Sequence, residues 1–168
     1  PWQTTTTRDV VVTDLADVPE DATAVVLNAT VTGTSAASFL TLWPAGAERP
    51  TVSNLNWAPG ATIANSVTVP VGEDGTISVY NHIGSADVVL DVVGYYTAEG
   101  GAWFLPSGPE RLMDSRSASQ VGPYATPWRS GTTRDARVGD VDGWAVEAVV
   151  ANTTVTNTTW ESFLTLWP

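Results

Sequence analysis

The segment ANSVTVPVGEDGTISVYN, residues 64–81, gives the clearest indication of the fold. From Asn65 to Val69 apolar residues alternate with polar ones, which is typical of a strand with one buried face and one face in solvent. The β-branched residues of 76–81 predict a second strand, and the intervening GEDG, residues 72–75, predicts a hairpin loop whose glycines take positive φ. This segment therefore predicts antiparallel β-structure.

The remainder of the chain carries more strands of this kind. Thr and Val together make up more than a quarter of the 168 residues, and their branched β-carbons favour strands. No stretch has helical periodicity. Apolar runs bounded by Gly, Pro, Asn and Asp predict strands over residues 8–15, 22–32, 38–43, 64–71, 76–81 and 87–96. The predicted fold class is all-β, an antiparallel β-sandwich or barrel-like module.

An internal repeat organises the chain. PWQTTTTRD at residues 1–9 returns as PWRSGTTRD at 127–135, an offset of 127 − 1 = 126, and SFLTLWP at 38–44 returns unchanged at 162–168, an offset of 168 − 44 = 124. The second occurrence is two residues shorter, most simply in the loop 140–144. We expect one repeat period followed by the first third of the next, within a longer tandem array.

The repeat and the composition divide the chain into three predicted parts. Residues 1–98 are a β module, the C-terminal part of one repeat period. Residues 99–126 are a connector rich in Gly, Pro and Ser that contains the segment RLMDSR. Residues 127–168 are the start of the next repeat and copy residues 1–44.

Three charged residues of the connector, Arg111, Asp114 and Arg116, are predicted to lock it onto the sheet. Leu112 and Met113 lie between them and draw the segment toward a core. Arginine and carboxylate side chains form bidentate pairs with well-defined geometry. The pattern favours this structural role over ligand binding.

Composition and charge exclude several classes of function. The chain has 18 acidic and 7 basic residues, a formal net charge of −11 with the single His82 neutral, and every basic residue is Arg. The absence of Lys and Cys excludes Schiff-base lysines, P-loop lysines, disulfides and thiolate metal sites. An acidic chain repels phosphates, so no nucleic-acid partner is expected. Asp91 interrupts the longest apolar run, residues 88–93, so no membrane span is expected.

Other polar residues are of types found in catalytic or metal sites, and each has a simpler structural interpretation. Asp87 and Asp91 lie on one face of a predicted strand, and two carboxylates on one face are the residue types of a glycosidase pair. His82 falls in a turn without an evident nucleophile, and we expect it to be a solvated turn residue. The acidic turns 73–75 and 140–143 resemble calcium loops only faintly, because further ligands are missing. We therefore predict no catalytic, cofactor-binding or metal-binding residues and no enzymatic activity.

The second occurrence of the repeat is predicted to form an interface between modules. Its strands lack the rest of their module, so they would expose backbone donors and an apolar face that need a partner. Eight tryptophans are many for this length, and tryptophan anchors protein interfaces and stacks on sugars. The predicted interface residues are Phe163, Leu164, Leu166, Trp167 and Trp128.

The order of these segments resembles a family of secreted tandem modules from high-GC Gram-positive bacteria, with repeats of the type LNVTVT, FLTVYPAG, SNLN, DVVGYY and RLLDTR. The matching stretches are residues 27–32, 39–46, 49–56, 64–72, 80–81, 87–96 and 109–116. Trp43 and Trp167 stand where the family has tyrosine, and Met113-Asp114-Ser115 replaces Leu-Asp-Thr. The resemblance implies non-catalytic modules outside the cell.

Together these features predict an extracellular or cell-surface structural protein. Its β modules would pack end to end into a filament, stalk or sheath, with further copies of the protein as partners and no cofactor. The alternative is a non-catalytic carbohydrate or cell-wall binding module attached to a secreted enzyme, for which cell-wall glycans would be the partner.

Overall fold

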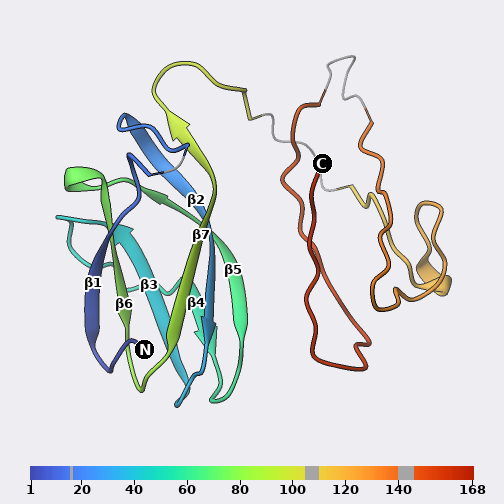
Figure 1. Ribbon diagram of the computed structural model, residues 1–168, viewed down its shortest axis with the longest axis horizontal. Coiled ribbons are helices and arrows are strands. Elements are labelled where there is room, and N and C mark those ends of the chain that lie inside the picture. The colour runs from blue at the N-terminus through green and yellow to red at the C-terminus, as the bar shows by residue number, and fades with distance from the viewer. Residues whose placement is uncertain (16, 105–109, 140–145) are drawn as a thin grey trace. The chain divides into compact units, whose positions relative to one another are not determined.

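The computed structural model describes residues 1–15, 17–104, 110–139 and 146–168 (Figure 1). The chain divides into two compact units, Pro1–Gly101 and Ala102–Pro168. The strands of the described residues all lie in the first unit. The described residues of the second unit form turns and extended segments with one 3₁₀ turn, η2, at Ser117–Ser119.

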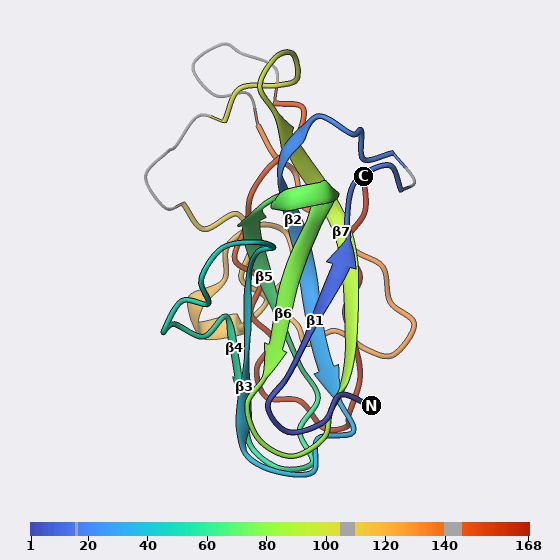
Figure 2. The same ribbon diagram turned by 90° about the vertical axis from the view of Figure 1, so that its left-hand side faces the viewer.

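The first unit consists of two antiparallel sheets. Its strands are β1 (Thr6–Val11), β2 (Ala22–Thr32), β3 (Ser38–Pro44), β4 (Leu55–Trp57), β5 (Ile63–Pro70), β6 (Thr76–Asn81) and β7 (Asp87–Thr97). One sheet has the order β1-β6-β3-β4 and the other the order β5-β2-β7, and Figures 1 and 2 show them as two layers. The prediction of antiparallel all-β structure is confirmed. The sheets remain separate layers, so the barrel-like alternative is wrong.

The core lies between the two sheets and follows the two-residue period of the strands. On the central strand β2 every second side chain points inward and is fully buried. The inner residues of both sheets are Val25, Leu27, Ala29, Val31, Leu40, Leu42, Val67, Val69, Ile77 and Val79. Burying each of the larger ones contributes about 1.5 to 3 kcal/mol, so this set is the main source of stability.

Most strands lie where the sequence predicts them, and one strand, β4, was not predicted. The predicted ranges 22–32 and 76–81 coincide with β2 and β6. β4 was missed because it has only three residues, too few for a periodic signal, although it pairs with β3 and buries Leu55 and Trp57. β4 is a strand because β3, which lies earlier in the chain, supplies the partners for its hydrogen bonds.

The predicted hairpin between residues 64–71 and 76–81 is wrong. β5 pairs with β2, and β6 pairs with β1 and β3, so the intervening loop carries the chain from one sheet to the other. Gly75 has a positive φ, 69°, as predicted. Gly72 has a φ of −94°, so the predicted positive φ is wrong at this residue. Turn residues indicate where the chain reverses, and they do not say whether the two flanking strands bond to each other.

The loop of residues 45–54 covers the outer face of the four-stranded sheet. Arg49 lies over the ring of Tyr80, 3.9 Å from its centroid, and Tyr80, Trp43 and Thr41 are buried. Three hydrogen bonds hold the loop: Thr41 Oγ1 donates to the Val52 carbonyl (2.9 Å), the Leu42 N–H to Asn54 Oδ1 (2.7 Å) and Trp43 Nε1 to the Ala47 carbonyl (3.0 Å). The strand β3 is therefore buried on both of its faces.

Replacing Gly72 by alanine is expected to lower the free energy of unfolding by about 2 to 3 kcal/mol. A Cβ at this position would overlap the backbone of Ala45, which cannot rotate away as a side chain would. Urea denaturation followed by tryptophan fluorescence measures the change. The matched control is Gly94→Ala, where the added Cβ meets open space. Equal stability of the two variants would contradict the prediction.

Candidate functional site

The strongest candidate site is the second occurrence of the repeat. We call residues 1–44 the first repeat segment and residues 127–168 the second repeat segment. Both end in SFLTLWP, which is buried in the first and exposed in the second. The exposed fractions are 0% against 41% for Leu40 and Leu164, 4% against 65% for Leu42 and Leu166, and 7% against 64% for Trp43 and Trp167. One peptide thus occurs in two environments.

The difference follows from strand pairing. The first repeat segment supplies β1, β2 and β3, and no two of these strands pair with each other. β1 pairs with β6, β2 with β5 and β7, and β3 with β4 and β6. A segment that repeats only β1 to β3 therefore contains no pair of compatible strands. The prediction of strands in the second repeat segment is accordingly wrong for its described residues, which contain none.

The opening turn nevertheless has the same local conformation in both repeat segments. The Thr6 N–H donates to the Gln3 carbonyl (3.3 Å), and at the corresponding positions the Thr132 N–H donates to the Arg129 carbonyl (3.1 Å). The residue before each donor is left-handed, with a φ of 52° at Thr5 and 68° at Gly131. This turn needs no partner strand, so it forms in both places.

Two further local features recur. Arg8 lies over the ring of Trp2 at 4.8 Å, and Arg134 lies over the ring of Trp128 at 5.2 Å. The left-handed residue after β2, Gly33 with a φ of 58°, corresponds to Asn157 with a φ of 56°. Asparagine tolerates this conformation better than other residues with a side chain. Trp128, a predicted interface residue, therefore packs on an arginine of its own segment.

The three charged residues of the connector come together around one carboxylate. Arg116 donates to both oxygens of Asp114 from Nε (3.0 Å to Oδ1) and Nη2 (2.7 Å to Oδ2), and its backbone N–H also donates to Oδ1 (3.0 Å). Arg111 Nη1 adds a contact of 2.8 Å to Oδ2. Paired backbone hydrogen bonds between Asp114 and Val121 close the loop. Attachment of this cluster to the sheet stays a prediction.

The hydrogen bonds from the Arg116 side chain, followed by the one from its backbone, hold the pKa of Asp114 well below its usual range. Because the folded pKa is depressed, the stabilisation of the folded state by the ionised Asp114 carboxylate is present above the ordinary carboxyl pKa and is lost as the pH falls through the folded value.

We expect Asp114→Asn to abolish the protection of the Arg116 Nε–H against hydrogen exchange, measured by NMR from pH 3 to 7. Glu110→Gln, a change at an exposed carboxylate in the same segment, is the control. Protection unchanged in Asp114→Asn would contradict the assignment.

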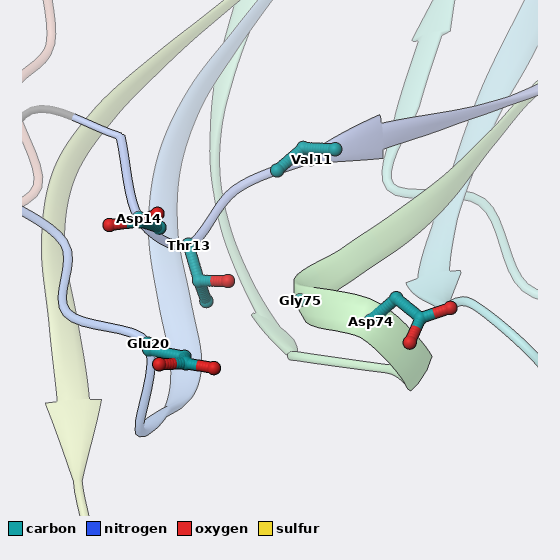
Figure 3. Close-up of a pocket in the computed structure, with 6 residues that line it drawn as sticks. All are labelled: Val11, Thr13, Asp14, Glu20, Asp74 and Gly75. Atoms are coloured by element: carbon teal, nitrogen blue, oxygen red, sulfur yellow. The ribbon is translucent and has the colours of Figure 1, made fainter.

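An acidic cleft of about 540 Å³ lies where the loop after β1 meets the loop before β6. Its lining residues are Val11, Thr13, Asp14, Glu20, Asp74 and Gly75 (Figure 3). The three carboxylates do not converge on one point, and the described part of the chain has no cluster of three His, Cys, Asp or Glu placed to hold a metal. The other calcium-like turn, residues 140–143, lies outside the described residues.

The remaining polar candidates do not assemble a reaction site. Asp87 and Asp91 lie on the exposed face of the three-stranded sheet, and Asp87 Oδ1 is 3.2 Å from the N-terminal amine. His82 stacks on Phe39, with ring centroids 4.6 Å apart, and its Nδ1 is 3.2 Å from the Tyr80 hydroxyl. His82 was predicted to be a solvated turn residue, and the structure instead places it, half-buried, in an aromatic cluster.

Asn81 is a structurally important residue that no sequence motif marks. It is fully buried at the end of β6, where its amide bonds to residues far away in the chain. An asparagine inside a strand of β-branched residues is unusual, and that departure from strand propensity was the available signal.

Comparison of the chain with protein-family models, curated proteins and solved structures finds no match. Within residues 1–15, 17–104, 110–139 and 146–168, no helix is long and apolar enough to cross a membrane.

Proposed function

We propose that the chain belongs to an extracellular structural protein whose β modules associate end to end into a surface filament, stalk or sheath. The observation that carries this proposal is the exposure of SFLTLWP in the second repeat segment, where Phe163 is 90% exposed, although the same peptide is buried in the first. An apolar peptide of this kind is normally covered by the rest of its protein or by a partner. The extracellular location rests on the family resemblance of the sequence.

Strand addition is the physical means of association. An exposed apolar strand can pair with the edge of a sheet in a second molecule, and a head-to-tail contact that does not close into a ring produces an open filament. Within the described residues β1 pairs only with β6 and β7 only with β2, so both strands offer a free edge. Because the chain has neither Lys nor Cys, burial and hydrogen bonds would hold the assembly.

The alternative is a non-catalytic module that binds carbohydrate or cell wall. The observation in its favour is the exposure of Trp103 (93%) and Trp160 (85%), because flat exposed tryptophans stack on sugar rings. In this case the partner would be a glycan instead of a second copy of the protein.

Sedimentation velocity and negative-stain electron microscopy of the full chain distinguish the two functions. We expect concentration-dependent association and elongated particles. At a net charge of −11 the association should strengthen with salt, since the Debye length shortens to about 8 Å near 0.15 M. A monodisperse monomer that binds cell-wall glycans would contradict the structural function and support the alternative.

A further inference from the structure

We infer that the second repeat segment is a replacement set of strands that can take the place of β1, β2 and β3 in the same sandwich. The strands that would accept it are β4 to β7, which we call the β4–β7 framework. This inference goes beyond the proposed function, because it concerns which segment completes one sandwich and does not require a filament.

The pairing scheme supplies the first argument. Every pairing partner of β1, β2 and β3 belongs to the β4–β7 framework. Within these 168 residues the sequence of the framework occurs once, whereas the sequence of β1 to β3 occurs twice. Each repeat segment therefore carries the strand sequences that this framework pairs with, and only one of the two can pair with it at a time. The structure shows the state in which the first repeat segment is paired.

The contacts of β3 supply the second argument. SFLTLWP contributes Leu40 and Leu42 to the core, and its Thr41, Leu42 and Trp43 hold the loop of residues 45–54. Residues 162–168 repeat this peptide without a change, so every one of these contacts is available to them. The recurring turn, the Trp–Arg stacking and the left-handed residue after β2 show that the second repeat segment also has the matching local conformation.

The chain can reach the required position. In the exchanged state residues 98–131 connect the end of β7 to the counterpart of β1. These 34 residues span up to about 110 Å when extended, whereas the sheet is about 35 Å long from one end of β7 to the other. The chain order β4 to β7 followed by β1 to β3 is a circular permutation, and such permutations preserve many folds.

Two core positions explain why the first repeat segment is the one that is paired. Leu27 is fully buried, and its counterpart in the second repeat segment is Ala151, which would leave a cavity. Ala29 is also fully buried, and its counterpart Thr153 would bring a hydroxyl into the core. The exchange is therefore controlled by a few side chains, and it can be reversed by substituting them.

Disulfide trapping in the full chain tests the inference. The chain has no cysteine, so introduced pairs report unambiguously. Asn28 lies opposite Ser66 in the β2–β5 register, and its counterpart is Asn152. Asn28→Cys with Ser66→Cys reports the first repeat segment, and Asn152→Cys with Ser66→Cys reports the second. Trypsin cuts after Arg111 and Arg116 and so separates residue 66 from residue 152 for mass spectrometry.

The decisive variant exchanges the two core residues, Leu27→Ala with Ala151→Leu. We expect the yield of the 66–152 disulfide relative to the 28–66 disulfide to rise at least about thirtyfold over the unexchanged chain, because the cavity moves to the first repeat segment. The 66–152 disulfide supports the replacement whether it forms within one chain or between two chains. An unchanged ratio would overturn the inference.

A second pair of variants tests the inference even if the first variant replaces the strands in only part of the molecules. Leu27→Asp with Ala151→Leu disables the first repeat segment and repairs the second, whereas Leu27→Asp with Ala151→Asp disables both. We expect only the former to keep a cooperative urea transition and to form the 66–152 disulfide. If both chains are equally unfolded, the second repeat segment cannot replace the first.

Discussion

Replacing Asn81 by alanine is expected to lower the free energy of unfolding of the first unit by about 3 kcal/mol. The side chain is fully buried, and its Nδ2 donates to the carbonyls of Gln3 (3.1 Å) and Gly84 (2.9 Å) while its Oδ1 accepts from Ser38 Oγ (3.2 Å). Alanine would leave these groups without their partner, and each buried polar group without one costs about 1 to 3 kcal/mol.

Asn81 has this effect because it joins three separate parts of the fold. Gln3 precedes β1, Ser38 begins β3 and Gly84 lies between β6 and β7. A loss of 3 kcal/mol is a large fraction of the 5 to 15 kcal/mol that stabilises a typical domain. Urea denaturation measures it, with Asn56→Ala, an exposed asparagine in β4, as the matched control. A difference below about 1 kcal/mol between the two variants would show that these bonds contribute little.

Aspartate at Phe163, Leu164 and Trp167 together is expected to abolish association of the full chain. These side chains are exposed, and burying each in a partner would contribute about 1.5 to 3 kcal/mol. Losing all three should raise the concentration at which association begins at least about a hundredfold, as measured by sedimentation velocity. The first unit should keep its unfolding transition, because its own SFLTLWP at residues 38–44 is unchanged.

Exposed apolar residues outside the repeated peptide provide the control for this prediction. Trp160→Asp changes a tryptophan that is more exposed than Trp167, 85% against 64%, but its counterpart in the first repeat segment is Ala36. We expect this variant to associate as the unmodified chain does. If Trp160→Asp blocks association and the triple variant does not, the association surface lies elsewhere and the assembly proposal loses its basis.

Part of the candidate site could be named from the sequence. The repeat predicts Phe163, Leu164, Leu166 and Trp167 as interface residues, and in the structure these side chains are exposed, while their role in an interface stays a prediction. The structure also brings Arg111, Asp114 and Arg116 together, as their charges and close spacing suggested. Asn81 was not selected, because its partners lie up to 78 positions away in the chain.

The sequence by itself determined the β class, the positions of the longer strands and the side of β5 that is buried. These follow from alternation, which is a property of neighbouring residues along one strand. Only the tertiary structure decided that β5 pairs with β2 and not with β6, that three residues form β4, and which of two identical SFLTLWP peptides is buried. A strand's own residues say which face it buries, but its hydrogen-bond partners are supplied by distant segments, and two equal peptides differ only in whether such partners are present.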